Sequence, residues 1–297
     1  MQSSSISDLL KTYNENHIVE TKILDFRGVN KTIYNPSSAF EYNSKLLISA
    51  RVEEQDKFAE SETYFFENNN GLFVLRKDLP FFKLEDPFII KVNNLFVFGG
   101  VEVYKSNGNL DFRTVFYKGE TLETLERFAE GPLGMKDIRL VQLPDNRIGV
   151  FTRPQKGVYG LGQIGYLEIN NLDELADLDF YSAKIICTFP ENTWGGVNSP
   201  IFYNNQLYVF GHIANVSKDN SKNYYGTSFI FDLNKKEVKD FKIILKRDNF
   251  PKSKSKYPWL ENVVFPSACK ITNDYIYLYS GLSDYDCGFA KIKNYFK

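Results

Sequence analysis

Residues 84–100 read Leu84-Glu85-Asp86-Pro87-Phe88-Ile89-Ile90-Lys91-Val92-Asn93-Asn94-Leu95-Phe96-Val97-Phe98-Gly99-Gly100. Two carboxylates and a proline come first, then a β-rich run, an Asn-Asn turn, a second β-rich run and a Gly-Gly pair. Two such runs on either side of a short Asn turn are typical of a β-hairpin. The stretch therefore predicts a hairpin with an acidic pair at its entrance.

Four other segments resemble this hairpin at intervals of roughly 50 to 65 residues, within the range of four-stranded propeller blades. The five entrances are Asn35-Pro36, Asp86-Pro87, Lys136-Asp137-Ile138-Arg139, Ser199-Pro200 and Phe265-Pro266. A polar turn and an aromatic or β-branched run follow each entrance. The repeat predicts an all-β fold, a five-bladed β-propeller formed by residues 1–297 as one domain, with the entrances around a central pocket.

Segments outside the repeat carry weaker signals. Residues 1–17 form either an extended arm or a short helix, which Ser7 would cap if it starts at Asp8. Residues 18–29 alternate like a strand. Residues 121–128 and 172–178 are predicted to be helical connections, the second with Asn171 as its cap. The basic residues 246–256 suit a solvated loop, with a lid over the channel as the alternative.

The composition limits the function. The net charge of −1 gives no basic field that would recruit nucleic acid. Aromatic residues make up 16% of the chain, and they either fill sheet cores or line a sugar-binding cleft.

Cysteine and apolar patterns indicate the compartment. Cys187, Cys269 and Cys287 are far apart and odd in number, so we expect no disulfide framework and no metal site. The first residues lack the order of a secretory signal, and no apolar run approaches the ~18 residues that a membrane span needs. We therefore expect a soluble cytoplasmic protein without a membrane partner, and the oligomeric state stays open.

An ordered set of motifs extends from Asn35 to Asp284. It consists of Asn35-Pro36, Arg51, Glu85-Asp86-Pro87, Lys136-Asp137, Arg153-Pro154, His212 and Gly281-x-x-Asp284. This set resembles the β-mannoside phosphorylases of glycoside hydrolase family 130. It resembles more closely the mannosyltransferase/phosphorylases of glycosyltransferase family 108, long catalogued as a domain of unknown function.

The resemblance implies a function. Members of these families transfer mannose, with inversion, between a β-mannoside and inorganic phosphate in either direction, and some use a sugar nucleotide as donor. The implied substrates are β-1,2-linked mannose oligomers and phosphate or mannose 1-phosphate. Phosphate is then a co-substrate, and no cofactor is implied.

Asp86 matches the catalytic acid of the family. Cleavage of a glycosidic bond needs a proton on the leaving oxygen, and phosphate as nucleophile removes the need for a second carboxylate as base. The alternative role for Asp86 is a hydrogen bond to the turn backbone ahead of Pro87. Glu85 is expected to bind a sugar hydroxyl.

Lys136, Arg153 and His212 match the family positions that hold phosphate. A phosphate dianion in a partly desolvated pocket needs cations and fixed donors. The alternative for Lys136 and Arg153 is a solvated surface. Arg139 is either a second anion ligand or the salt-bridge partner of Asp137.

Candidates for binding mannose hydroxyls are polar side chains that can bridge two neighbouring hydroxyls. Together with Glu85 they are Asn35, Arg51, Asp137, Asn198 and Asp284. Four aromatic side chains are candidates either for stacking on sugars or for packing in the core. They are Trp194, Tyr104, Tyr159 and Tyr285.

The chain also departs from the family pattern. Phe88 follows the acidic motif where Arg is frequent, and Thr193 and Trp194 stand where a Lys often precedes the fourth repeat's Gly pair. Two other functions therefore remain open. One is an inverting hydrolase with Asp284 or Asp137 activating water, and the other is a non-catalytic propeller that binds glycans or a protein.

Overall fold

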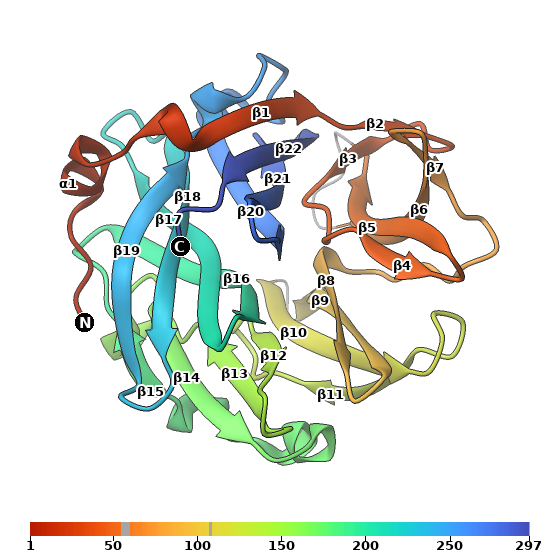
Figure 1. Ribbon diagram of the computed structural model, residues 1–297, viewed down its shortest axis with the longest axis horizontal. Coiled ribbons are helices and arrows are strands. Elements are labelled where there is room, and N and C mark those ends of the chain that lie inside the picture. The colour runs from red at the N-terminus through yellow and green to blue at the C-terminus, as the bar shows by residue number, and fades with distance from the viewer. Residues whose placement is uncertain (55–59, 107–108, 297) are drawn as a thin grey trace.

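The computed structural model describes residues 1–54, 60–106 and 109–296. Nearly all regular structure in this part of the chain is antiparallel β-sheet, and Figure 1 shows the sheets arranged around a common centre. The expected all-β class is therefore confirmed.

The first sheet has the order β2-β7-β6-β5-β3, and β4 also pairs with β5. Its strands are β2 (Asp25–Arg27), β3 (Thr32–Tyr34), β4 (Phe40–Tyr42), β5 (Lys45–Glu53), β6 (Glu62–Asn69) and β7 (Leu72–Leu75). Strand β5 is buried along most of its length, and it carries the functional candidate Arg51.

The second and third sheets are four-stranded meanders. The second contains β8 (Glu85–Val92), β9 (Leu95–Ser106), β10 (Asn109–Gly119) and β11 (Glu126–Glu130), and the third contains β12 (Arg139–Gln142), β13 (Ile148–Thr152), β14 (Ile164–Ile169) and β15 (Lys184–Cys187). The predicted hairpin is β8–β9. Asn93 and Asn94 join its strands with φ of 48° and 69°, the positive values that this tight turn requires.

The remaining strands form one eight-stranded sheet. They are β16 (Thr193–Tyr203), β17 (Gln206–Val216), β18 (Lys222–Asp232), β19 (Glu237–Leu245), β20 (Asn262–Ile271), β21 (Tyr275–Leu282), β22 (Asp286–Lys293) and β1 (Ile18–Ile23). A short parallel contact of Asn223 and Tyr224 with Asn262 and Val263 joins β18 to β20. This contact divides the sheet into β16–β19 and a second group in which the early strand β1 pairs with the late strand β22.

Helices are short and peripheral. They are α1 (Ile6–Lys11), η1 (Glu15–His17), η2 (Gly157–Tyr159), η3 (Leu172–Asp177), η4 (Phe180–Ser182), η5 (Arg247–Asn249) and η6 (Pro258–Leu260). Of the two possibilities for the N-terminal segment, the short helix is observed. Its cap is Ser5 instead of the expected Ser7, because the Ser5 hydroxyl accepts from the Asp8 amide. No helix among the described residues has the length and apolar character needed to cross a membrane.

The two predicted connecting helices have different outcomes. Asn171 caps η3 as expected, with its side chain accepting from the Asp173 and Glu174 amides. The prediction of a helix at residues 121–128 is wrong. Thr121 and Thr124 close a turn there, and β11 follows because its pairing with β10 outweighs local helix propensity.

The core lies between neighbouring sheets. One cluster joins β8–β11 to β12–β15, one joins β12–β15 to β16–β19, and others join the first sheet to the second and β16–β19 to β20–β22. A further cluster packs Ile48 and Phe66 of the first sheet against Cys287 of β22. The contacts between sheets therefore run around the centre and return to the first sheet.

Candidate active site

Four candidate residues share an unusual backbone conformation. Asn35, Asp86, Asp137 and Asp284 have φ of 47°, 49°, 61° and 50°. Asn and Asp tolerate this left-handed region because their short polar side chains hydrogen-bond locally. At Asp86 the pairing of β8 with β9 is also shifted between Glu85 and Phe88. Asn35 and Asp86, which precede prolines, and Asp137 and Asp284, which do not, thus share a bend of the backbone.

These bends surround a pocket of about 290 Å³. It is lined by Asn35, Arg51, Glu85, Asp86, Lys136, Lys222, Tyr224, Lys256, Tyr257, Trp259, Leu260, Val263, Phe265 and Asp284. Ten residues were assigned from the sequence to catalysis, to phosphate binding or to binding of mannose hydroxyls, and six of them are in this lining. The other four, Asp137, Arg153, Asn198 and His212, form a buried cluster behind this lining.

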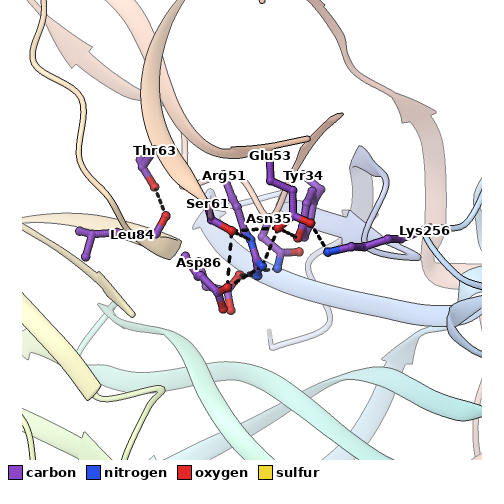
Figure 2. A network of polar contacts seen from close by, with 10 residues as sticks. Tyr34, Asn35, Arg51, Glu53, Ser61, Thr63, Leu84, Asp86 and Lys256 are labelled. Carbon is purple, nitrogen blue, oxygen red and sulfur yellow. Dashed lines mark hydrogen bonds and ion pairs between the residues drawn. The ribbon is translucent and has the colours of Figure 1, made fainter. Parts of the chain in front are cut away.

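Asp86 is a buried carboxylate with fixed partners. It is 7% exposed, and its Oδ1 accepts from Asn35 Nδ2 at 2.6 Å and from Arg51 Nη1 at 3.3 Å (Figure 2). Gly281 makes room for this pair, because a Cβ there would lie 1.6 Å from Asn35 Oδ1. Both contacts end on one oxygen, so the Asp86 carboxyl is oriented while it lines the pocket.

Arg51 contacts three carboxylates on the acidic side of the pocket. Its Nη2 donates to Glu85 at 2.7 Å and to Glu53 at 2.8 Å, and its Nε donates to Ser61 at 2.9 Å. The guanidinium also lies over the ring of Tyr34, 4.7 Å from its centre. Figure 2 shows Tyr34, Glu53, Ser61 and Asp86 gathered around Arg51. One arginine therefore holds Glu53, Glu85 and Asp86 together.

The carboxylates of the pocket differ in their proton affinity. Burial raises the pKa of Glu85, partly opposed by Arg51, and burial likewise raises the pKa of Asp284, again opposed by Arg51. Burial favours a higher pKa for Glu53 as well, but Arg51 and Lys256 outweigh it and the pKa lies below its ordinary value. Glu85 and Asp284 therefore protonate more readily than an ordinary carboxyl group, and the neighbouring Glu53 less readily.

Lys136 connects the pocket to the buried cluster. Burial alone would lower its pKa, but the carboxylates of Asp137 and Asp86 raise it above the ordinary value, so the ammonium is charged at neutral pH. Asp137 itself pairs with Arg153 Nη1 at 2.9 Å. Although burial opposes ionisation of Asp137, Arg153 and Lys136 lower its pKa to about 2.

Gly196 lies where the buried cluster comes together. A Cβ on Gly196 would lie 2.9 Å from Cε1 of His212 and 3.1 Å from Cδ of Arg153. It would also lie 3.4 Å from Oδ2 of Asp137. The absence of a side chain at Gly196 on β16 therefore allows the close approach of these three residues.

His212 is neutral in this cluster. Burial lowers its pKa to about 3, although Asp137 acts in the opposite direction. Its Nδ1 lies 2.8 Å from the Asn198 side-chain oxygen, which accepts the single imidazole proton. With this proton donated to Asn198, the unprotonated Nε2 of His212 can accept a hydrogen bond from a protonated phosphate oxygen but cannot donate one, so Lys136 and Arg153 supply the positive charge.

Four candidate residues carry buried polar atoms without a hydrogen-bond partner among the described residues. These atoms are Asn35 Oδ1, Asp137 Oδ1, Arg153 Nε and Asn198 Nδ2. Buried polar atoms are rarely left unpaired in folded proteins. Asn35 lines the pocket and the other three residues belong to the buried cluster behind it, so a polar ligand in this region would find unpaired donors and acceptors.

Arg139 has neither of its two expected roles. It is 2% exposed, and it donates to the backbone carbonyls of Asn198 and Ile138. Its guanidinium lies 4.6 Å from the ring centre of Phe88, which explains an aromatic residue after the acidic motif.

The four aromatic candidates do not line the pocket. Tyr104 lies against Arg113, Tyr159 stacks on Tyr181, and Tyr285 borders neighbouring cavities. Trp194 is buried edge-on against Tyr224. The aromatic residues in the lining are instead Tyr224, Tyr257, Trp259 and Phe265. Tyr224 stacks on His212 with ring centres 5.6 Å apart and an angle of 27° between the ring planes. Tyr224 therefore connects the pocket to the buried cluster.

Glu53 and Lys256 also contribute to the site, although neither was expected from the sequence. Glu53 follows Arg51 by two residues on β5, and this spacing places both side chains on the same face of the strand, which is a signal that could have been used. Lys256 had no such signal. It ends the basic segment 246–256, whose middle lysines are exposed as a loop would be, yet its ammonium pairs with the buried Glu53.

Several solved structures are similar to this chain. A mannose phosphorylase from Leishmania mexicana (MPT-4), solved in complex with a phosphate ion, has 33% identity and a TM-score of 0.88, with 97% of this chain and 91% of that chain covered. A GDP-Man-dependent mannosyltransferase from the same organism (MPT-1) has 29% identity and a TM-score of 0.86, with 98% and 94% covered. The β-1,2-mannobiose phosphorylase of Listeria innocua has 14% identity and a TM-score of 0.66, with 92% and 90% covered, and this likeness shows the fold alone.

The comparison with curated protein sequences found no match. Residues 11–297 match a family described as "Protein of unknown function (DUF1861)". This match spans nearly the whole chain, and the chain belongs to the DUF1861 family.

Proposed function

We propose that the chain is a single domain, a five-bladed β-propeller with the pocket at its centre. The three smaller units are β2–β7, β8–β11 and β12–β15, and the parallel contact divides the large sheet into two more. The core clusters that link each unit to the next support this division. The pairing of β1 with β22 would then close the ring.

We further propose that the protein is an inverting β-mannoside phosphorylase or mannosyltransferase. It would transfer mannose reversibly between β-1,2-linked mannose oligomers and phosphate, in the cytoplasm and without a cofactor. The observation that carries this proposal is one small pocket that holds an oriented carboxyl, Asp86, and a charged ammonium, Lys136. The similarity to the Leishmania mannose phosphorylase supports the substrate class.

Asp86 acts in this proposal as the proton donor. A phosphate oxygen attacks the anomeric carbon of the mannosyl unit from the face opposite the leaving group. The bond from that carbon to the glycosidic oxygen breaks, and the Asp86 proton passes to this oxygen. The products are mannose 1-phosphate with inverted configuration and a chain shorter by one unit. Asn35 and Arg51 keep the carboxyl in position during the transfer.

Phosphate binds in this proposal at the Lys136 side of the pocket. Lys136 supplies a positive charge in the lining of the pocket, and Arg153 adds a second charge from behind while Asp137 fixes its position. His212, whose Nδ1 proton is held by Asn198, contributes its Nε2 as an acceptor for a protonated phosphate oxygen. Asn35, Arg51, Glu85 and Asp284 face the sugar, and Asp137 and Asn198 act through the groups that they hold.

The test uses purified protein with mannose 1-phosphate and mannose, and it follows phosphate release and oligomer formation. Asp86→Asn is expected to reduce the rate by a factor of about 10² to 10⁴, the usual contribution of a general acid. The matched control is Asp219→Asn, which changes a carboxylate held by Ser217 and Ser221 in an exposed turn. Normal phosphate release by Asp86→Asn would refute the role of the acid.

An inverting hydrolase is the second candidate, because Asp284 is another carboxylate in the lining of the same pocket. Inverting hydrolysis needs such a second carboxylate to activate water. Hydrolysis of β-1,2-mannobiose at a rate independent of added phosphate would favour the hydrolase.

The similarity to a GDP-Man-dependent mannosyltransferase makes GDP-mannose the alternative donor in the same assay. Oligomer formation from GDP-mannose, with none from mannose 1-phosphate, would assign nucleotide-sugar transfer. Binding of mannose oligomers without turnover of any donor would leave a glycan-binding propeller.

A further inference from the structure

Two aromatic rings stand at the edge of the pocket. Tyr257 and Trp259 stack with ring centres 4.6 Å apart and planes 7° from parallel, and both residues line the pocket. Trp259 is nevertheless 46% exposed. An indole with so much exposed surface beside a polar pocket is suited to bind a ligand with one apolar face.

The segment that carries these rings is held in place. Lys256 pairs with the buried Glu53, and its backbone amide donates to the Ser283 carbonyl at 3.0 Å. On the other side of the rings, Leu260 is buried at the end of η6. The Tyr257–Trp259 pair is therefore attached to the same network that orients Asp86, and it needs little ordering before a ligand binds.

The size of the pocket limits what it can enclose. Its volume of about 290 Å³ lies at the lower end of the ~300–1,000 Å³ range of ligand pockets. An oligosaccharide must therefore continue past the rim. Sugar rings carry C–H groups on one face, and these pack well on an aromatic ring.

We propose that Tyr257 and Trp259 form a platform on which the mannose units beyond the pocket stack, so that the protein prefers oligomeric over monomeric mannose. This inference rests on the proposed function, since it assumes mannose oligomers as substrates. It adds a binding subsite and makes Trp259 a determinant of chain-length preference.

The experiment measures binding by calorimetry in Asp86→Asn protein, so that turnover does not interfere. The probes are mannose, β-1,2-mannobiose and β-1,2-mannotetraose. Trp259→Ala is expected to weaken tetraose binding about tenfold, the scale of one good aromatic contact, and to leave mannose binding unchanged. Trp259→Phe should retain part of the tetraose affinity.

The matched control is Phe81→Ala. Phe81 is 53% exposed and stacks on Tyr64 at 5.5 Å, but it does not contribute to the described lining of the pocket. The Phe81→Ala variant should bind all three probes with the same affinity as the parent protein.

Each other outcome has a distinct meaning. Equal affinity of parent and Trp259→Ala for the tetraose, or equal losses for mannose and tetraose, would overturn the platform while the proposed function stands. If Trp259→Ala does not fold, Trp259→Phe takes its place. The platform would then be overturned if Trp259→Phe binds the tetraose as tightly as the parent does and the parent binds mannose and tetraose equally well. Absence of binding of every probe to the parent would overturn both the substrate class and the platform.

Discussion

Replacing Arg51 with methionine tests whether the acidic side of the pocket depends on one cation. The side chain is 10% exposed, and it contacts Glu53 and Glu85 through Nη2 and Asp86 through Nη1. Removing one partner from a buried ion pair costs about 3–5 kcal/mol, because the remaining charge stays buried. At about 2–4 °C per kcal/mol, we expect the melting temperature to fall by about 6–20 °C.

The stability deficit should depend on pH. Arg51 holds the pKa of Glu53 below its ordinary value against the effect of burial, so this ionised carboxylate stabilises the wild type above its unfolded pKa, and the contribution is lost as pH falls through the lower folded pKa. Without Arg51 the buried carboxylates take up protons at a higher pH, which removes their repulsion. The deficit of Arg51→Met is therefore largest near pH 8 and smaller at pH 5.

The assays are thermal unfolding, which gives the melting temperature, and urea denaturation, which gives the free energy of unfolding, both followed by circular dichroism at pH 8 and pH 5. Arg76→Met is the control, since Arg76 also pairs with two carboxylates, Glu67 and Asp78, but at the periphery, where Asp78 is 63% exposed. We expect it to lose at most about 1 kcal/mol. Equal losses of stability in both variants, or a deficit of Arg51→Met that is the same at pH 8 and pH 5, would refute the central role of Arg51.

Three further predictions concern the site. Gly281→Ala should displace Asn35, because the new Cβ would lie 1.6 Å from its Oδ1, and lower kcat/KM at least tenfold, as steady-state kinetics would reveal. The imidazole of His212, with its pKa lowered to about 3 by burial, should stay neutral in NMR titrations from pH 8 to pH 5, and a midpoint near 6.5 would contradict its burial. Lys256→Met leaves the buried Glu53 with one cation fewer and should lower the midpoint of thermal unfolding, whereas an unchanged midpoint would show that the pair adds nothing.

The sequence predicted those parts of the site that belong to the repeat. Asn35 and Asp86 each stand before a proline at the entrance of a hairpin, so equivalent positions could be aligned without any structure. Arg51 was singled out only through the motif set that carries the family resemblance. The local sequence pattern could not predict how deeply each side chain is buried. Lys136 lines the pocket, whereas its neighbour Asp137 is buried behind the lining.

Other contributors depend on tertiary contacts. Lys256 lies in a loop and Trp259 in the short helix η6, and neither segment has a periodic pattern that would predict its position. At residues 121–128 the local pattern predicted a helix that does not form. There a helix-like composition gave way to pairing of β11 with β10. Side chains from loops are fixed by the partners they meet, and those partners are far away in sequence.

The left-handed Asn and Asp residues show why fold and function use the same sequence signal. Asn93 and Asn94 take positive φ at an exposed hairpin turn, and Asp86 and Asp137 take it where the chain is buried. An exposed turn residue is solvated by water, but a buried carboxylate needs partners from the protein. Here those partners are other candidate residues, since Asp137 is held by Arg153. Removing one of these residues therefore leaves the charge of another buried without its partner. We accordingly expect a substitution at one residue to disturb the positions of the others.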